Sequence, residues 1–379
     1  MRIIHILLGK ANPNTMNGVN KVVHNLATEQ HKSGHAVEVW GITATPNKIS
    51  HEHTYTLNLF ESRKVRFLLS NPLKDALDAL AGTSTLVHLH SVLIPELFSV
   101  SRRLKFNNVP WVLSPHSGYN KNVLLKNKTL KSIYIALFER RLVSGARKVH
   151  AIGATEIVEI KSLDPLADVV LIPNGQSFDG VAFTEVETVS PKERPVFGFC
   201  GRLARNHKGL DLMLEGFADY KKQGGLGELW LIGDGPDKNL LISLAKNLEI
   251  SASTLFLGAM FGDEKLSTLN KMDVFVHSSR WDVIPTATLE VSALGIPLLI
   301  SEATNMGAYV RQYGNGLVLP ENTPFHITTA MIEFEKMINS GDIKVMGEKS
   351  VHMIEGDLNW PVISKNVVAS LYAQNRHSS

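Results

Sequence analysis

Short apolar runs alternate with longer segments of helical periodicity through most of the chain. The first half carries such runs at residues 3–8, 35–42, 86–90, 111–114, 148–152 and 169–173, and the second half repeats them at 196–201, 229–233, 254–258, 274–278 and 297–301. Near-continuous apolar strands separated by helices are typical of parallel sheets covered on both faces. Two such sets predict an α/β protein with two doubly wound, Rossmann-like domains.

A break in this alternation predicts the domain boundary. Residues 176–195 show no helical period and carry Pro, Gly and acidic residues, as interdomain linkers do. We therefore assign 1–178 to an N-terminal domain and 179–359 to a C-terminal domain. Further on, Ile363, Val367 and Leu371 recur on one helical face. The expected helix over about 360–379 either ends the second domain or packs back on the first.

The net charge of +3 conceals an asymmetry between the two halves. Residues 1–178 hold 21 Lys and Arg against 12 Asp and Glu, whereas 179–379 hold 18 against 24. Segment 121–148 alone has eight basic residues and one acid. This segment is either a solvated helix face or a patch that contacts an anionic membrane or an acidic acceptor. No recognition motif or basic run interleaved with aromatics points to nucleic acid.

Composition favours a cytoplasmic protein. Cys200 is the only cysteine, which excludes disulfides within the chain and thiolate metal sites and fits a reducing compartment. The first apolar stretch is too short for the core of a signal peptide, so we expect it to be a buried strand. No window is long enough to span a bilayer, and peripheral contact with the inner membrane through 121–148 is the further expectation.

Ligands of open parallel sheets bind beyond the carboxyl ends of the strands, often where a glycine-rich turn leads into a helix. The first such turn is in 9–27, where Gly18 directly precedes a predicted helix. The free backbone N–H groups at the start of this helix would face any ligand there. The turn lacks the G-x-G-x-x-G fingerprint, so a simple strand–helix connection explains it as well.

The second turn is in 198–217 and carries two cations. Arg202 and Lys208 lie between a predicted strand and a helix that we expect to start near Gly209. Arg can hold a phosphate through two donors and Lys binds it as a point charge, so the pair suits a diphosphate. The alternative is two solvated loop residues, although Gly201 and Gly209 would let the backbone approach a ligand closely.

The third turn joins the strand at 274–278 to a helix from Thr286 to about Leu294. Pro285 favours the start of a helix, and the N–H groups of Thr286, Ala287 and Thr288 would have no partner within the helix.

Two carboxylates flank the start of this helix, Asp282 before it and Glu290 about one turn inside. A diphosphate at the helix end with hydroxyls on both sides, as in a nucleotide sugar, would use both acids. The alternative is that Asp282 caps the helix and Glu290 pairs with a lysine.

Three of the 15 histidines attract attention. His116 follows the strand at 111–114 and lies beside Ser117 and Gly118, a place typical of site residues. His88 and His90 point to the same face of one strand. They could be metal ligands, but the sequence offers no third ligand, so we interpret them as structural.

The order of these motifs resembles that of the retaining glycosyltransferases of family four. The resemblance runs through the Gly18 loop, LVHLHS, SPHSGYN, IPNGQ (172–176), GRLARNHKG, LWLIGDGP, FLGAM and the acid-x7-acid segment that ends in TLEVSALGIP. The family usually has Glu at both ends of the last motif, whereas this chain has Asp282 first. The resemblance implies the GT-B fold, with two Rossmann-like domains that face a deep interdomain cleft.

The resemblance also implies roles for individual residues. Arg202 and Lys208 match the cations that hold the donor diphosphate, Glu290 the carboxylate on the ribose, and Asp282 the one on the transferred sugar. The implied donor-binding set is Gly18, Arg202, Lys208, Gly233, Gly258, Met260, Asp282, Pro285, Thr286, Ala287 and Glu290. The implied catalytic set is His116, Asp282, Arg202 and Lys208.

The resemblance implies a retaining transferase that moves a hexose from a UDP-sugar or GDP-sugar to a glycan, bound by the N-terminal domain. Because no Asp-x-Asp motif suits Mg²⁺, we expect no metal and no further cofactor. A lipid-linked acceptor in bacterial O-antigen, capsule or exopolysaccharide synthesis fits the basic segment. The alternatives are a nucleotide-sugar epimerase on the same fold, a glycogen-type phosphorylase, for which the chain is short, and a non-catalytic sugar-nucleotide-binding protein.

Overall fold

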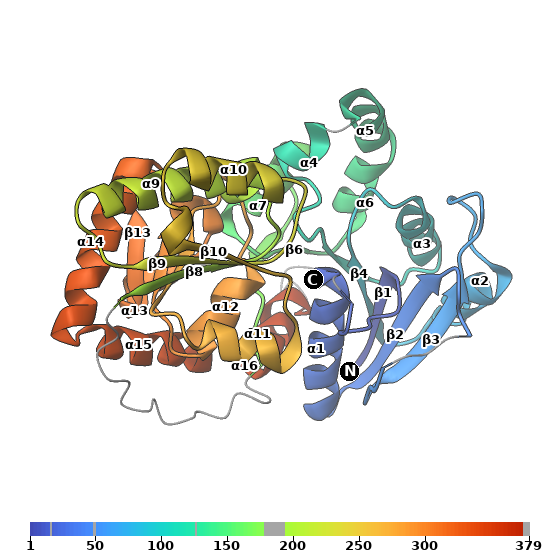
Figure 1. Cartoon of the computed structure of the whole chain (residues 1–379). Helices are drawn as coiled ribbons and strands as arrows, with labels where there is room; N and C mark the ends of the chain where they lie inside the picture. Colours follow the sequence, from blue (N-terminus) through green and yellow to red (C-terminus); the bar gives the residue numbers. More distant parts are fainter. Residues whose placement is uncertain (16, 48–50, 126, 178–193, 374–379) are drawn as a thin grey trace. The chain divides into compact units, whose positions relative to one another are not determined.

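The computed structural model describes residues 1–15, 17–47, 51–125, 127–177 and 194–373 (Figure 1). The chain forms two compact units: Met1–Asn174 together with the stretch that begins at Trp360, and Gly175–Asn359. Most of the predicted linker lies outside the described residues.

The first unit is built on one parallel sheet in the order β3-β2-β1-β4-β5-β6-β7. The strands are β1 (Arg2–Leu8), β2 (Ala36–Thr43), β3 (Thr56–Glu61), β4 (Thr85–His90), β5 (Trp111–Ser114), β6 (Val149–Ala151) and β7 (Val169–Leu171). The helices are α1 (Gly18–Lys32), α2 (Asn71–Asp78), α3 (Pro95–Phe106), α4 (Lys121–Leu125), α5 (Lys128–Tyr134), the π-helix η1 (Ile135–Glu139), α6 (Arg140–Gly145) and α7 (Ala154–Leu163). The sequence pattern did not predict β3, an edge strand that is only partly buried and has no continuous apolar run.

The end of the chain completes the core of the first unit. Helix α16 (Trp360–Asn366) and the π-helix η4 (Val367–Leu371) pack on α1, so their apolar stripe joins one of the two apolar clusters of this unit. Ile363 and Val367 are buried there with Val23 and Leu26 of α1. The second of the two expected placements of this helix is therefore the one observed.

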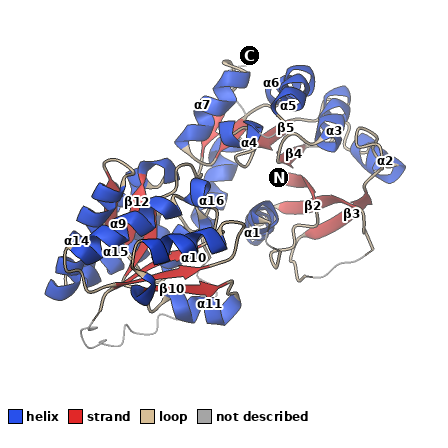
Figure 2. Ribbon diagram, turned by 45° about the horizontal axis from the view of Figure 1, so that its top comes forward, coloured by secondary structure: helices blue, strands red, loops and turns tan. Residues whose placement is uncertain are grey.

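The second unit has a parallel sheet in the order β10-β9-β8-β11-β12-β13, with helices on both of its faces (Figure 2). The strands are β8 (Val196–Cys200), β9 (Glu228–Ile232), β10 (Thr254–Gly258), β11 (Val274–His277), β12 (Leu298–Ser301) and β13 (Gly316–Leu319), the last not predicted. The helices are α8 (Arg205–Lys208), α9 (Leu210–Lys222), α10 (Lys238–Asn247), α11 (Gly262–Leu269), α12 (Thr286–Ala293), α13 (Gly307–Tyr313), α14 (Pro324–Ser340) and α15 (Ile343–Gly356), with 3-10 turns η2 (Ser251–Ser253) and η3 (Glu302–Thr304).

In both sheets the strand order reverses direction at one place. The reversal falls between β1 and β4 in the first unit and between β8 and β11 in the second. Loops that leave two neighbouring strands on opposite faces of the sheet separate at such a point, and the crevice between them is where doubly wound folds bind ligands.

Four histidines are buried in the core of the first unit. His5 of β1 lies opposite His88 of β4 in the ladder, His90 ends β4, and His150 lies in β6. All four are at most 3% exposed. Burial lowers the pKa of His5 and of His150 to about 4, because a buried imidazolium loses its hydration. These imidazoles are therefore neutral in the folded protein at neutral pH.

We expect the stability of the first unit to fall as the pH is lowered from 6.5 towards 4. In this window the unfolded chain protonates its imidazoles and the folded chain does not, so unfolding takes up protons. The loss at pH 5 is about 2 kcal/mol for each fully buried imidazole. Urea unfolding at several pH values measures it.

Glu139 changes the stability in the opposite direction as the pH falls, because burial raises the pKa of its carboxyl to about 7 and the folded protein therefore takes up this proton first. The informative comparison is therefore between variants. His150→Gln should unfold with a weaker pH dependence than the wild type between pH 6.5 and 4, whereas replacing the exposed His352 with Gln should leave the dependence unchanged. Equal pH dependence in the wild type and His150→Gln would contradict the assignment of neutral buried imidazoles.

Candidate functional site

Two loops of the second unit meet at an ion pair between Lys208 and Asp282. Lys208 ends the short helix α8 after β8, and Asp282 follows β11. The Lys208 ammonium contacts Oδ2 of Asp282, the same oxygen that lies 3.0 Å from Nε2 of His277 and accepts a hydrogen bond from Oγ of Ser279 at 3.2 Å. The structure thus brings together two of the residues that the sequence singled out.

The charges at this pair are largely shielded from water. The side chains of Lys208 and Asp282 are 12% and 16% exposed. Burial alone would raise the pKa of Asp282, but the hydrogen bond with His277 and the charge of Lys208 outweigh it and hold that pKa well below the usual range. Asp282 is therefore a carboxylate at any physiological pH, with a lysine as its counter-ion.

Close backbone packing holds these loops in place. Gly209 has a left-handed φ of +62°, and a Cβ there would lie 2.0 Å from the carbonyl oxygen of Ser278. The Asn305 amide donates to the backbone oxygen of Asp282 at 2.7 Å. The buried Ile284 adopts a φ of 46°, which is strained for a β-branched residue and typical of functional sites.

The N-terminus of α12 presents unpaired backbone donors beside this ion pair. Pro285 precedes the helix with a φ of −61°, and no side chain in the described chain caps it. The suggestion that Asp282 is the cap is therefore wrong. The Thr288 N–H bonds to the Pro285 carbonyl at 3.0 Å, so the donors left over are those of Thr286 and Ala287 rather than all three that we expected.

Glu290 is held by a lysine, as the alternative interpretation expected. Nζ of Lys265 in α11 lies 2.8 Å from Oε2 of Glu290, and both side chains are about one-fifth exposed. Burial raises the pKa of the neighbouring Cys200 to about 11, so this thiol is protonated at neutral pH.

The ends of β8, β9 and β10 approach one another closely. A Cβ on Gly233 would lie 1.9 Å from the carbonyl oxygen of Gly201, and the Gly233 N–H donates to the Gly258 carbonyl at 2.7 Å. Met260 follows β10 and is half-buried. Arg202 is exposed after β8 and forms no ion pair with any described residue, which leaves its guanidinium available to a ligand.

Gly18 lies in the first unit at the start of α1. The side chain of Asn17 caps this helix by accepting the Val19 N–H at 3.0 Å, so one of the donors expected to face a ligand is already used. Gly18 is exposed, and no described atom lies within 4 Å of where its Cβ would be. Within the first unit nothing therefore demands glycine at this position.

His116 lies in a strained loop at the end of β5. His116 and Ser117 have φ values of 51° and 62°, in the left-handed region that non-glycine residues rarely adopt. The buried carboxylate of Glu156 in α7 holds this loop by accepting the N–H groups of Ser117 and of Ile152. Two consecutive strained residues fixed by a buried acid are typical of a functional site.

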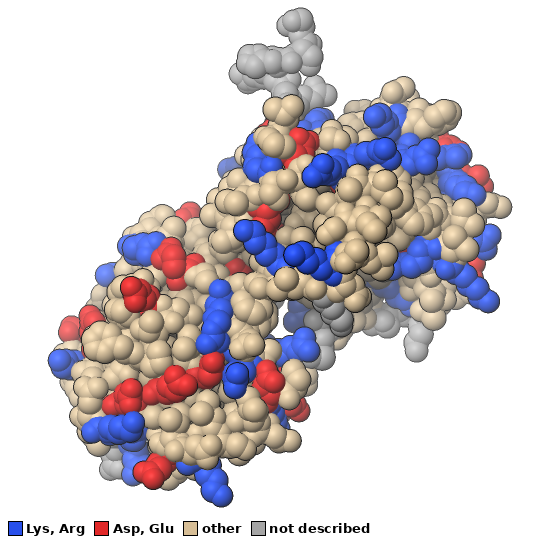
Figure 3. Space-filling view, turned by 90° about the horizontal axis from the view of Figure 1, so that it is seen from above, with Lys and Arg blue, Asp and Glu red and all other residues tan. Residues whose placement is uncertain are grey.

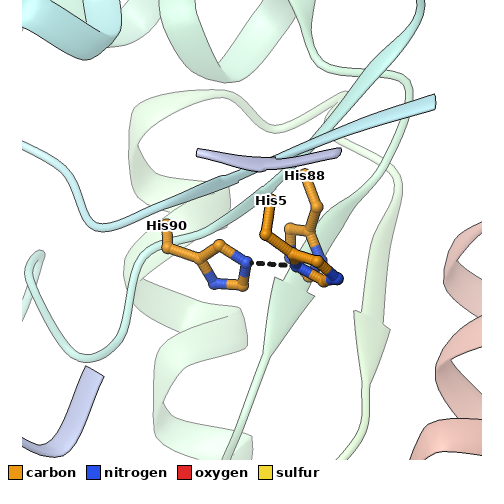
Figure 4. Close-up of side chains that lie close together, drawn as sticks. All are labelled: His5, His88 and His90. Atoms are coloured by element: carbon orange, nitrogen blue, oxygen red, sulfur yellow. Dashed lines mark hydrogen bonds between the residues drawn. The ribbon is translucent and has the colours of Figure 1, made fainter. Parts of the chain in front are cut away.

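His5, His88 and His90 lie side by side, with ring nitrogens within 4.8 Å of one another (Figure 4). His5 is the third histidine that the sequence did not reveal. The ring nitrogens of His88 bond to Tyr372 at 2.8 Å and to Ser114 at 2.7 Å, and those of His5 bond to Gln30 at 2.8 Å and to His90 at 2.9 Å. Since these nitrogens are all engaged within the protein, the hydrogen bonds favour a structural role over a metal site.

Some site residues escaped the sequence analysis. His277 could have been found, because it ends a buried strand just before the Asp282 loop. Lys265 and Glu156 carry no such signal, since each lies on a helix distant in sequence from its partner.

Two family descriptions match this chain. Residues 16–177 match Glycosyltransferase Family 4, and residues 182–345 match Glycosyl transferases group 1. The chain belongs to the group 1, family 4 glycosyltransferases, and its two parallel sheets have the GT-B fold.

Individual relatives are similar over shorter stretches. A GDP-mannose-dependent alpha-mannosyltransferase of Mycobacterium tuberculosis is 33% identical over 131 residues, 35% of this chain and 32% of that protein. The lipopolysaccharide core biosynthesis glycosyltransferase LpsE of Rhizobium meliloti is 30% identical over 139 residues, 37% of this chain and 39% of that protein. The matches thus span about a third of the length of these curated relatives.

Among solved structures, Anabaena Alr3699/HepE in complex with UDP is similar with a TM-score of 0.71 at 14% identity, over 99% of this chain and 100% of that one. At this identity the likeness concerns the fold.

The contact between Gly209 and Ser278 can be tested with a matched glycine. Gly224 also has a positive φ, +89°, but no described atom lies within 4 Å of its Cβ position. We expect Gly224→Ala to cost about 1 kcal/mol through backbone strain alone. Gly209→Ala should cost a further 1–3 kcal/mol or so, because its methyl group would overlap the Ser278 carbonyl. Denaturant unfolding measures both, and equal losses would contradict the close approach.

Proposed function

We propose that this protein is a retaining, metal-independent glycosyltransferase that moves a hexose from a nucleoside-diphosphate sugar to a glycan acceptor. The observation that carries the proposal is the juxtaposition of Lys208, Asp282 and the uncapped start of α12 at the point where the second sheet reverses. Cations and free N–H groups together suit a diphosphate, and a carboxylate beside them suits sugar hydroxyls.

The donor would bind with its diphosphate at the second unit. Lys208 and the exposed Arg202 supply positive charge, and the N–H groups of Thr286 and Ala287 supply hydrogen bonds. Asp282 would accept a hydroxyl of the transferred sugar, and Glu290 would exchange Lys265 for the ribose hydroxyls. Anabaena Alr3699/HepE has been solved with UDP-glucose, which supports a nucleotide sugar as the donor class.

Catalysis would be mainly electrostatic. As the bond between sugar and phosphate breaks, negative charge grows on the departing diphosphate, where Lys208, Arg202 and the end of α12 stabilise it. Lys208 and the backbone of α12 are held in place before the reaction, so they need little reorganisation. Retention of configuration would follow if the acceptor hydroxyl attacks from the side of the leaving phosphate, which takes up its proton.

The acceptor is proposed to be a glycan, linked to lipid, in the synthesis of a bacterial surface polysaccharide. The relative LpsE is described as a lipopolysaccharide core biosynthesis glycosyltransferase, which supports a lipid-linked glycan as the class of acceptor. The first unit would hold the acceptor and the second the donor.

The basic segment of the first unit supports a peripheral site on an anionic bilayer. Over α4, α5 and η1 the exposed large apolar side chains among the described residues are Val123, Leu125, Leu130, Ile133 and Leu137. Figure 3 shows that Lys and Arg outnumber acidic side chains on the visible face of the first unit. Apolar side chains among cations suit anionic lipid headgroups. No helix of the described residues is long and apolar enough to cross a membrane.

Substitution of the donor-site cations tests the catalytic proposal. Lys208→Ala should lower kcat by a factor of about 10²–10³, the usual effect of removing one preorganised charge or donor from a transition state. Arg202→Lys keeps the charge but loses the two-pronged geometry, so we expect a loss of roughly 10-fold. Release of UDP or GDP from a panel of sugar nucleotides measures both.

Lys246, exposed on α10, provides the matched control, and Lys246→Ala should retain full activity. EDTA should leave the rate unchanged, and the anomeric configuration of the product should match that of the donor. Wild-type turnover by both Lys208→Ala and Glu290→Ala would overturn the proposal. If the donor is isomerised in the absence of an acceptor, the protein is an epimerase. If the nucleotide binds but no sugar is transferred or released, the protein is a non-catalytic binding protein.

Sedimentation with liposomes tests the membrane contact. The wild type should bind vesicles of phosphatidylglycerol at low salt. Replacing Lys121 and Lys128 with Glu should weaken binding by at least about 30-fold, since each basic residue near an anionic surface contributes about 1 kcal/mol and the new carboxylates add repulsion. The same exchange at Lys246 and Lys344 of the second unit should have no effect. Failure of the wild type to bind would remove the membrane from the proposal.

A further inference from the structure

A chain of hydrogen bonds crosses the buried core of the first unit, and one of its ends fixes its direction. That end is the backbone carbonyl of Ile172, which can only accept. Nε2 of His150 lies 2.7 Å from this oxygen and therefore carries the single proton of the neutral ring, which leaves Nδ1 to accept from the Ser114 hydroxyl at 2.7 Å. Ser114 in turn accepts from Nε2 of His88 at 2.7 Å, and Nδ1 of His88 accepts from the Tyr372 hydroxyl at 2.8 Å.

The same direction continues to His116. The Tyr372 hydroxyl accepts from the amide nitrogen of Gln30 at 3.2 Å, and the Gln30 oxygen accepts from Nε2 of His5 at 2.8 Å. Nδ1 of His5 then accepts from Nε2 of His90 at 2.9 Å, and Nδ1 of His90 accepts from Nε2 of His116 at 3.0 Å. Each ring N–H and each hydroxyl on this path meets an acceptor, and Nδ1 of His116 is left without a proton.

We propose that this chain makes Gln30 a positioning residue that sets His116 as a neutral group whose Nδ1 accepts a hydrogen bond from a substrate hydroxyl. The identity of that hydroxyl as one of a sugar rests on the proposed function. The placement of protons along these hydrogen bonds does not rest on the proposed function, because it follows from the Ile172 carbonyl. The reverse direction would set two acceptors face to face at His150 and Ile172.

The position of the His116 ring is fixed by separate contacts. Glu156 holds the strained backbone of His116 and Ser117, and the ring stacks on that of His90 with centroids 5.3 Å apart. Burial lowers the pKa of His116 to about 3, which keeps the ring neutral. Position, charge and proton placement are thus each determined within the first unit.

This arrangement selects the chemistry of the partner. A phosphate oxygen accepts hydrogen bonds and has no proton to offer to Nδ1, whereas a hydroxyl does. The hydrogen-bond chain also cannot pass protons beyond His150, since it ends at the Ile172 carbonyl, which has no proton to give. His116 therefore serves to orient a hydroxyl and not to protonate a leaving group.

Replacing Gln30 with Glu should reverse the chain over three histidines. A proton entering at Nδ1 of His116 lets that ring pass its Nε2 proton to Nδ1 of His90, which passes its own Nε2 proton to Nδ1 of His5. His5 then becomes an imidazolium beside the new carboxylate, and His116 remains neutral with its proton on Nδ1.

The groups that face position 30 are His5 from β1 and the Tyr372 hydroxyl that follows η4, with His88 one bond beyond. Arg147 is a cation close to these groups, since its guanidinium donates to the Tyr372 carbonyl.

Nitrogen-15 spectra of histidine-labelled protein test the reversal, with His116 signals assigned by their loss in His116→Gln. In the wild type the His116 proton should reside on Nε2, and in Gln30→Glu on Nδ1. With the acceptor turned into a donor, kcat/KM should fall about 10- to 100-fold at neutral pH and recover at higher pH as the added proton leaves. Identical His116 spectra in both proteins would overturn the proposal.

A second pair of variants avoids a new charge. Tyr372→Phe removes the hydroxyl that orients Gln30, so the His116 proton should distribute over both ring nitrogens. Tyr55→Phe is the matched control. The Tyr55 hydroxyl also bonds a histidine, His24 at 3.0 Å, but this pair is not part of the hydrogen-bond chain that leads to His116. An unchanged His116 spectrum in Tyr372→Phe would also overturn the proposal. Absence of donor turnover in the wild type would refute the proposed function but leave the spectroscopic result standing.

Discussion

The salt bridge between Lys208 and Asp282 depends on the strand order of the second sheet. Because β8 and β11 are neighbours, the loops that leave their carboxyl ends can meet, although 74 residues separate the two side chains along the chain. Two tight backbone features lie beside the bridge. Ser278 leaves no room for a side chain at Gly209, and Ile284 between Asp282 and Pro285 has a strained positive φ. A partly buried charge pair of this kind contributes little net stability, so we do not assign the bridge a mainly stabilising role.

The first unit has different side chains where its strand order reverses. Between β1 and β4 it has neutral imidazoles in place of charges, and each ring uses its neighbour to satisfy its hydrogen bonds. A buried polar network of this kind is costly when incomplete and rigid when complete. On the proposed function, the second unit would offer charge to a ligand, whereas the first unit would offer a histidine with a defined direction of hydrogen bonding.

The sequence predicted the fold well where patterns are local. Buried strands such as 111–114 and helix starts such as Thr286 are encoded by runs of neighbouring residues. Strands β3 and β13 were missed because edge strands are short or only partly apolar. The family resemblance placed Lys208 and Asp282 in one donor site, but it did not predict their direct ion pair. Lys265 beside Glu290 and Glu156 beneath Ser117 were not predicted either, since such pairings depend on how distant helices pack.

The return of α16 and η4 to the first unit has a consequence for biosynthesis. Helix α1 and the neighbouring strands leave the ribosome early, yet the side chains of Trp360 and Ile363 that cover them are made only after the whole second unit. Tyr372, which bonds to His88 and Gln30, arrives later still. An apolar face and several buried imidazoles therefore remain uncovered while the second unit is made, and the nascent chain is open to chaperones or misfolding until α16 and η4 dock.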